Sequence, residues 1–121
     1  MKNVAQANDA LAHSHPEGCP AYHRAIELIG KRWNGVILRD LLAGPTRFSE
    51  LRSRIPGITD TMLAQRLREL EDAGLVSREI VESRPILVQY QLTEIGRDLS
   101  PILGAIASWS DDWASTCTAS E

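Results

Sequence analysis

The sequence predicts a mainly α-helical domain with a small β-hairpin, arranged as a winged helix-turn-helix. Three observations within residues 47–94 support this fold class. A short amphipathic helix leads into the turn residues Pro56-Gly57, and a longer amphipathic helix follows. Two alternating, β-rich runs come next, joined at a Ser83-Arg84-Pro85 corner. Helix, turn, helix and hairpin in this order would offer a helix to a DNA major groove and a hairpin to the flanking backbone.

The rest of the chain divides around this core. Residues 1–17 show no sustained periodicity, which predicts a flexible N-terminal arm. The winged helix-turn-helix domain with its terminal helices is expected at residues 18–115, and a C-terminal tail at residues 116–121. A chain of 121 residues fits one such domain and leaves little room for a second.

The composition favours a cytoplasmic protein that needs no cofactor. No apolar run reaches the roughly 20 residues required to cross a bilayer, so no membrane partner is expected. Met1–His15 has no apolar segment typical of a secretory signal, and two cysteines do not make a disulfide framework. The sequence also contains no Gly-rich phosphate loop and no nucleophile elbow, which argues against an enzyme.

Charge is distributed unevenly along the chain. The formal net charge is −3, which is unusual for a protein that binds DNA. Residues 31–54 nevertheless contain six basic and two acidic side chains, a net charge of +4, while residues 94–121 contain one basic and five acidic ones, a net charge of −4. The basic segment would suit phosphate; the alternative is a chance unevenness of solvated faces.

The first helices follow from apolar spacing and from proline and glycine. Pro20 suits the first position of a helix, with Cys19 as its N-cap, and helical spacing continues over Ala21–Lys31. A second helix is expected at Asn34–Ala43, because Gly44-Pro45 stops it.

The later elements are bounded by similar signals. Phe48–Ile55 forms the third helix. The fourth runs from an N-cap at Thr59 to about Ala73 and stops at Gly74. The expected strands, Leu75–Glu82 and Ile86–Leu92, are followed by a final helix that Thr93 caps and Pro101 kinks.

The fourth helix has the pattern of a recognition helix. With Leu63, Leu67 and Leu70 on the buried side, Thr61, Gln65 and Arg68 fall on the opposite side. Thr61 and Gln65 are therefore the best candidates for reading bases, and Arg68 for a base or a phosphate. Thr59 at the helix start and Arg47 in the basic segment would bind phosphate, and Arg84 at the hairpin tip would meet the DNA backbone or minor groove.

Two charged residues of this helix complicate the assignment. Asp60 argues against DNA contact because phosphate repels a carboxylate, although an acidic side chain also favours a helix N-terminus. Arg66 lies beside the buried stripe, so an intramolecular ion pair is as good an expectation as a DNA contact. The alternative for the whole outward face is an ordinary solvated surface.

Several blocks in fixed order carry a family resemblance. They are Cys19-Pro20, Ile29–Trp33, Ile37–Leu41, Gly44–Leu51, Pro56–Ile58, Met62–Leu70, Gly74–Val76, Tyr90–Gly96 and Pro101–Leu103. In these blocks the chain resembles the HxlR-type transcriptional regulators, relatives of the MarR group, over about residues 19–113. The resemblance implies a bacterial or archaeal homodimer that binds double-stranded DNA at a pseudo-palindromic operator. Asp60-Thr61 departs from the polar or basic residues that members often carry there, so no operator sequence can be transferred.

The resemblance places the dimer interface on the first and last helices. The last helix has apolar residues on more than one face, which one small core does not easily absorb. The interface residues expected from this are Ile102, Ile106, Trp109 and Trp113. The alternative is that these side chains only cover the core.

Cys19 matches the cysteine that many HxlR-type regulators place ahead of the first helix, where some sense oxidants, quinones or aldehydes. A thiol at a helix N-cap also lies at the positive end of the helix dipole, which lowers its pKa. Cys117 of one chain could then approach Cys19 of the other and form an intersubunit disulfide. The alternative is a cap or buried thiol without a signalling role.

Three further alternatives stay open. His13, His15, Cys19 and His23 could bind a metal, but their spacing matches no compact motif, so no metal site is predicted. A small organic effector could bind at the dimer interface. The winged helix could also serve only for protein contact.

The function that the sequence favours is repression of transcription rather than activation.

Overall fold

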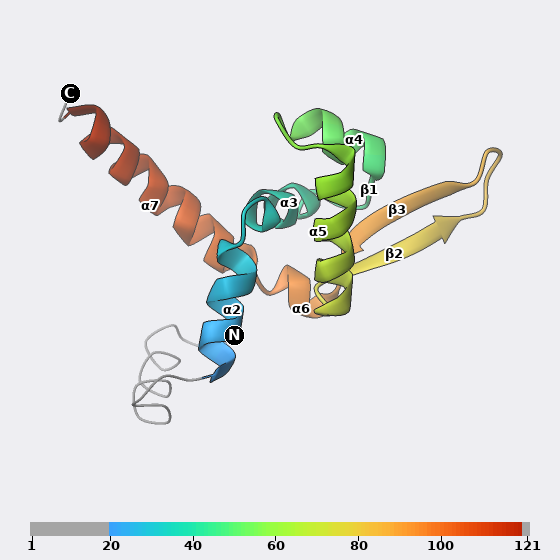
Figure 1. Cartoon of the computed structure of the whole chain (residues 1–121), viewed down its shortest axis with the longest axis horizontal. Coiled ribbons are helices and arrows are strands. Elements are labelled where there is room, and N and C mark those ends of the chain that lie inside the picture. The colour runs from blue at the N-terminus through green and yellow to red at the C-terminus, as the bar shows by residue number, and fades with distance from the viewer. Residues whose placement is uncertain (1–19, 120–121) are drawn as a thin grey trace. The chain divides into compact units, whose positions relative to one another are not determined.

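The computed structural model describes residues 20–119, with side chains up to residue 116. The expected arm at residues 1–17 and the Cys19 N-cap therefore lie outside the described residues. Two compact units divide between Lys31 and Arg32. Within the described part the elements are α2 (Pro20–Gly30), α3 (Asn34–Leu41), β1 (Thr46–Arg47), α4 (Phe48–Arg54), α5 (Asp60–Asp72), β2 (Val76–Val81), β3 (Leu87–Leu92), α6 (Glu94–Arg97) and α7 (Ser100–Ala119) (Figure 1).

The first unit contributes one described helix, α2. It begins at Pro20, as the sequence predicts, because proline lacks only an N–H that the first turn leaves unsatisfied in any case. Its described side chains are all at least partly exposed, and Tyr22 and Ile26 are among the exposed apolar ones.

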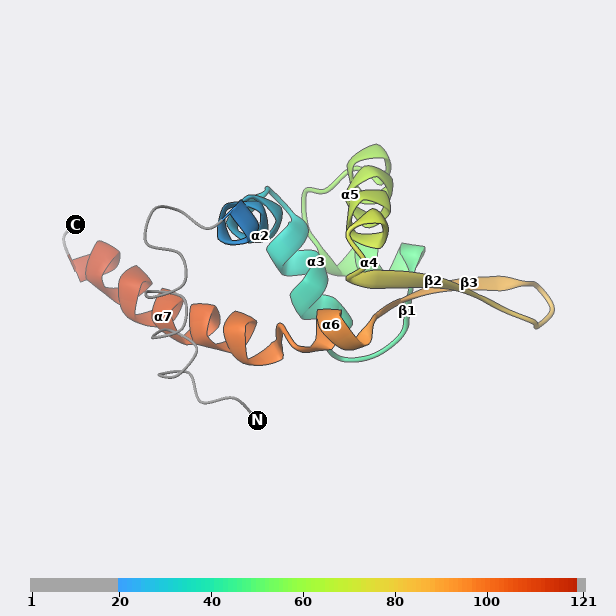
Figure 2. The same cartoon turned by 90° about the horizontal axis from the view of Figure 1, so that it is seen from below.

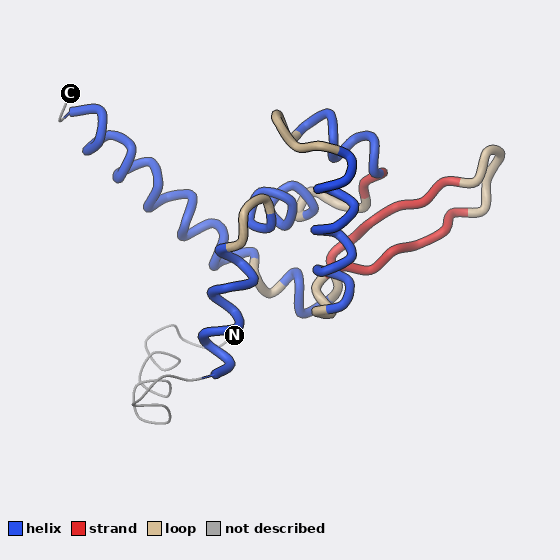
Figure 3. The backbone as a smooth tube through the Cα atoms, in the orientation of Figure 1, coloured by secondary structure: helices blue, strands red, loops and turns tan. Residues whose placement is uncertain are grey.

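The core of the second unit lies where α3, α4 and α5 meet the sheet. The apolar face of each helix supplies it: Ile37, Leu38 and Leu41 from α3, Leu51 from α4, and the predicted stripe of Leu63, Leu67 and Leu70 from α5. Burying such side chains contributes about 1.5–3 kcal/mol each, which explains why these short helices are stable together. The β2–β3 hairpin, the wing, extends away from the three helices (Figures 2 and 3).

The sheet has three antiparallel strands in the order β1-β3-β2. Val76 pairs with Leu92 at the base of the wing and Val81 with Leu87 toward its tip. On the other side of β3, Thr46 pairs with Tyr90. The sequence analysis missed β1, because a strand of two residues shows no alternation; its pairing with β3 anchors the start of α4 to the wing.

Both ends of α5 carry the expected caps. The Thr59 hydroxyl accepts a hydrogen bond from the backbone N–H of Met62 at 3.1 Å. At the other end, Gly74 has a φ of 79°, which glycine adopts readily. The N–H of Leu75 donates to the carbonyl of Leu70 at 3.0 Å, and that of Gly74 to Glu71 at 2.9 Å, the two bonds of a Schellman motif. Local sequence signals therefore set the length of this helix.

The C-terminal helix differs from the prediction in two ways. Instead of one helix kinked at Pro101, α6 ends at Arg97 and α7 starts at Ser100, so Pro101 lies in the first turn of α7, where its missing N–H costs nothing. Helix α7 also continues to Ala119, into the residues expected to form the C-terminal tail. The hydroxyls of Ser115 and Thr116 support this end by donating to the carbonyls of Asp111 and Asp112, both at 3.0 Å.

None of the helices in the described residues combines the length and the apolarity that crossing a membrane requires.

Candidate nucleic-acid interface

The face of α5 that points away from the core presents the three predicted base-reading residues. Thr61, Gln65 and Arg68 are exposed, while the leucine stripe on the other side of the helix is buried. The side chain of Arg68 forms no hydrogen bond or ion pair with another described residue. Helix α5 can therefore present polar side chains without disturbing the core, which is what a helix in a DNA groove requires.

The middle of α5 is held by a network around Glu69. Arg66 is 9% exposed, and its Nε donates to the carbonyl of Arg32 at 3.0 Å. Its NH1 donates to both carboxylate oxygens of Glu69, at 3.2 and 3.1 Å. Glu69 also accepts a bond from Nε2 of Gln65 at 3.4 Å. Arg66 is therefore occupied within the protein, and its contacts tie α5 to the residue that precedes Trp33.

The N-terminus of α5 carries an ion pair that the sequence analysis missed. Arg52 of α4 pairs through Nε with Oδ1 of Asp60, and both side chains are more than half exposed. Asp60 thus has a basic partner eight positions earlier in the chain. The only sequence signal was the position of Arg52 in the basic segment. The pair places a guanidinium beside the start of α5.

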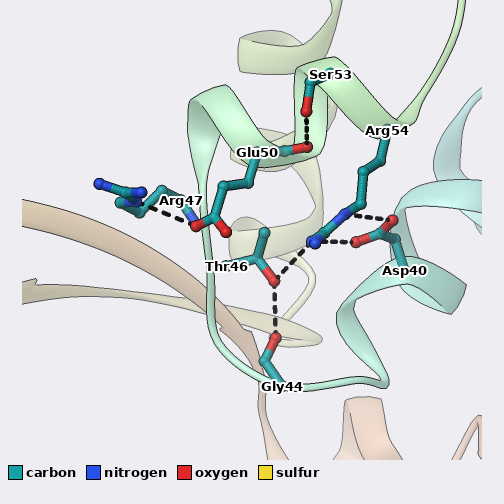
Figure 4. Close-up of polar contacts among 7 residues, drawn as sticks. All are labelled: Asp40, Gly44, Thr46, Arg47, Glu50, Ser53 and Arg54. Carbon is teal, nitrogen blue, oxygen red and sulfur yellow. Dashed lines mark hydrogen bonds and ion pairs between the residues drawn. The ribbon is translucent and has the colours of Figure 1, made fainter.

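Arg47 is positioned by the start of α4 (Figure 4). Oε1 of Glu50 accepts hydrogen bonds from the backbone N–H and from Nε of Arg47, both at 3.1 Å. These two bonds, the backbone one first, hold the pKa of the Glu50 carboxyl below its ordinary value of 4.5. An arginine side chain has no acceptor, so only the Glu50 half of a capping box exists here. Arg47 is exposed but already paired with a carboxylate.

A second charged contact joins α3 to α4 (Figure 4). Arg54 forms a bidentate pair with Asp40, at 2.8 Å from NH2 to Oδ1 and 3.1 Å from Nε to Oδ2. The same NH2 donates to the Thr46 hydroxyl at 3.2 Å, and that hydroxyl donates to the carbonyl of Gly44 at 2.9 Å. Three arginines of the basic segment, Arg47, Arg52 and Arg54, are thus neutralised locally.

Arg84 lies at the exposed tip of the wing, between β2 and β3, as predicted. It forms no hydrogen bond or ion pair with another residue of the described part. On the wing itself, Gln91 and Glu79 of the paired strands are hydrogen-bonded. The wing therefore offers one free guanidinium at its tip.

The remaining predicted residues lie on α7 or outside the described part. Ile102, Ile106, Trp109 and Trp113 of α7 are all exposed, between 47% and 62%. The rings of Trp109 and Trp113 are stacked, with centroids 5.7 Å apart and planes within 8°. Cys19, His13, His15 and the side chain of Cys117 lie outside the description, and of the possible metal ligands named above only His23, on α2, is described.

Comparison with known proteins agrees with this geometry. A family model described as HxlR-like helix-turn-helix matches residues 28–118. Two relatives from Bacillus subtilis (strain 168) are similar over most of their length. The HTH-type transcriptional regulator YodB is 42% identical over 95 residues, which are 78% of this chain and 85% of YodB. The uncharacterized HTH-type transcriptional regulator YvaP is 39% identical over 97 residues, 80% of this chain and 90% of YvaP.

Solved structures give the same result. The reduced form of YodB matches with a TM-score of 0.73 at 42% identity, covering 78% of this chain and 93% of that one. The redox regulator HypR in its reduced form matches with a TM-score of 0.75 at 35% identity, covering 82% of this chain and 98% of that one. These are winged-helix regulators, so the predicted fold class is confirmed.

Proposed function

Because this chain belongs to the HxlR-like helix-turn-helix family of transcriptional regulators, we propose that it represses transcription as a homodimer bound to a pseudo-palindromic operator. The family is one of DNA-binding regulators rather than enzymes, in line with the prediction from sequence. The single observation that carries the proposal is the division of α5 into a buried leucine stripe and an outward face with Thr61, Gln65 and Arg68.

In this proposal α5 enters the major groove. Gln65 pairs with adenine, Thr61 contacts a base edge near the helix start, and Arg68 reaches a base or a phosphate. Thr59 and the free N–H groups of the first turn of α5 bind a phosphate, and Arg47 and Arg84 contact the DNA backbone on either side. Arg52 joins this set, because its guanidinium lies beside the start of α5, where a phosphate would compete with Asp60 for it.

Gln65→Ala tests the reading of bases. Bases are distinguished only by direct contacts, so the variant should lose affinity for the operator by about tenfold while its affinity for random DNA stays the same. Fluorescence anisotropy with both DNAs at one salt concentration measures this. Equal losses on both would remove Gln65 from the base-reading residues.

Dimerisation through α7 is supported by its exposed apolar side chains. Ile102, Ile106, Trp109 and Trp113 are spaced by four, three and four residues, so they share one helical face. Four large apolar side chains that are exposed on one face of a helix mark an interaction surface. Trp109→Glu combined with Trp113→Glu should give a monomer in sedimentation equilibrium. A double variant that stays dimeric would place the interface elsewhere.

Release from DNA is proposed to follow oxidation or alkylation of Cys19. In the sequence Cys19 directly precedes Pro20, the first residue of α2, and a thiol that caps the N-terminus of a helix is favoured as thiolate. Solved structures of the similar YodB include diamide-treated and quinone-bound forms, and HypR has been solved in an oxidised form. An intersubunit disulfide between Cys19 and Cys117 is the corresponding oxidised state.

A mobility shift on the upstream promoter fragment tests this response. Wild-type protein should bind specifically, lose the DNA on diamide treatment and regain it with added thiol. Cys19→Ser should bind equally well and ignore diamide. A Cys19→Ser protein that still responds would exclude the thiol and favour a non-covalent effector. Non-reducing gels that show no covalent dimer from wild type would end the disulfide proposal.

The rival function is a winged helix used only for protein contact. One observation favours it: Arg47, Arg52 and Arg54 all pair with carboxylates, which lowers the positive potential of this surface. A salt titration separates the two functions, because DNA binding weakens log-linearly with salt as counterions are released. Absence of specific DNA binding on a genome-wide set of fragments would favour the rival.

A further inference from the structure

A cavity opens between α3 and the turn that leads into α5. Its volume is about 620 Å³, within the range of 300–1,000 Å³ usual for small-molecule sites. Trp33, Val36 and Pro56 contribute to its apolar lining, and Arg39, Asp40 and Arg54 to its charged lining. All of these residues belong to the second unit, so its own elements form the cavity.

The apolar lining is not required by the core. Val36 of α3 is 50% exposed, whereas its neighbours Ile37 and Leu38 are fully buried on the other side of the same helix. An apolar side chain left half exposed inside a concave surface is free to contact an apolar ligand. Trp33 adds an indole ring to the same wall.

The charged lining carries one net positive charge. Arg54 and Asp40 neutralise each other through their bidentate pair. Arg39 forms no side-chain hydrogen bond or ion pair with any other residue between 20 and 116, so its guanidinium keeps its full capacity to donate. Arginine binds carboxylates in a planar, bidentate manner. The cavity therefore complements a monoanion with a flat apolar body.

Trp33 is held at this wall in a strained conformation. Its φ of 81° lies in the left-handed region, which is costly for a bulky residue and tends to occur at functional sites. The Arg32 guanidinium covers the indole at 4.7 Å from the ring centroid. Cη2 of Trp33 also lies 3.6 Å from the position that a Cβ on Gly57 would occupy. The ring thus contacts both the cavity and the helix-turn-helix turn.

We propose that this cavity is an effector site for a planar apolar monoanion of the aromatic carboxylate class. Arg39 binds the carboxylate, and the rings lie against Trp33, Val36 and Pro56. The proposed site includes neither Cys19 nor the exposed residues of α7, and it needs no covalent step.

Coupling to DNA, which rests on the proposed function, follows two short routes to α5. Pro56 and Gly57 form the turn immediately before Thr59, the N-cap of α5. The carbonyl of Arg32, adjacent to Trp33, accepts the hydrogen bond of Arg66 in the middle of α5. A ligand that shifts Trp33 therefore displaces both the start and the middle of the recognition helix.

Binding is tested by NMR on the full chain, with 1-naphthoate as the probe and neutral 1-naphthamide as its isostere. The indole N–H signal of Trp33, assigned with Trp33→Phe, should shift saturably with naphthoate, and naphthamide should bind about tenfold more weakly. Arg39→Gln should remove that difference. The control Arg78→Gln removes the same charge from the exposed wing and should leave it intact. Val36→Phe places a larger side chain in the apolar wall and should weaken binding of both compounds.

Three results would overturn the site: a Trp33 signal that does not move, equal affinity for the two compounds, or equal weakening by Arg39→Gln and Arg78→Gln. The effector role is tested by promoter affinity, which should change at least about fivefold with saturating naphthoate in wild type and not in Arg39→Gln. Unchanged affinity in wild type would refute that role. If the ligand-free protein did not bind the promoter, the proposed function would be refuted. The NMR titration would still show whether the cavity binds naphthoate.

Discussion

Asp60 competes with DNA phosphate for Arg52, so Asp60→Asn should strengthen promoter binding. The two side chains are 67% and 54% exposed, and an ion pair this accessible to water contributes at most about 1 kcal/mol to folding. Thr59 still caps α5 after the change. The free energy of unfolding should therefore fall by less than about 2 kcal/mol, since only this pair and a favourable helix-dipole contact are lost.

The gain at the DNA comes from one removed charge and one released arginine. Two unit charges about 6 Å apart in water interact by about 0.7 kcal/mol, so removing the repulsion between Asp60 and a phosphate should raise affinity about threefold. If released Arg52 then neutralises one further phosphate, the slope of log K against log salt should steepen by about 0.9.

Fluorescence anisotropy with the promoter fragment at several KCl concentrations measures both quantities. The matched control is Asp72→Asn, which removes the same charge at the far end of α5, where the side chain is also exposed. An equal gain of affinity in the control would mean that the effect comes from the change in net charge alone. A loss of affinity in Asp60→Asn would refute the competition and show instead that Asp60 orients Arg52 for the phosphate.

Three further predictions concern the fold around this surface. Leu67→Ala should lower the free energy of unfolding by about 3 kcal/mol in urea titrations, because Leu67 is almost completely buried in the stripe of α5. Thr59→Ala should cost about 1 kcal/mol and Thr59→Ser very little, since only a hydroxyl is needed to cap Met62. Glu50 has a lowered pKa in the folded chain, so its contribution is present above pH 4.5 and is lost as the pH falls through the folded pKa. An NMR titration should show this, with the Glu50 pKa returning toward 4.5 in Arg47→Ala; an unchanged value would leave only the backbone bond as its cause.

The elements of this protein were largely predictable because their signals are local. Periodicity placed Leu63, Leu67 and Leu70 on one buried face, and a cap residue and a glycine marked the two ends of α5. Each of these signals depends on residues within about four positions of one another, a distance over which helix geometry alone determines which side chains are neighbours. Strand β1 escaped because its two residues are defined only by pairing with β3, more than 40 positions away.

The break between α6 and α7 could not be predicted from the neighbouring residues in the sequence either. Proline was expected to kink one helix, yet the chain ends α6 before Pro101. Before this break, at the start of α6, the hydroxyl of Thr93 donates to the carbonyl of Gly74. Within α6, the backbone of Gly96 lies so close to Leu75 that a Cβ would be 2.2 Å from its carbonyl oxygen. These contacts hold α6 against the residues that follow α5, so the course of the chain before the break depends on tertiary contacts as well as on the proline.

The amino-acid order was sufficient for the fold class, the outward face of α5 and the family. The tertiary structure decided which charges meet: Arg52 with Asp60, Arg54 with Asp40, and Arg66 with the carbonyl of Arg32. It also decided that Arg39, Arg68 and Arg84 have no such partner among the described residues. Charge counts add along the chain, but an ion pair needs two side chains within about 4 Å, and packing of the helices against one another sets that distance.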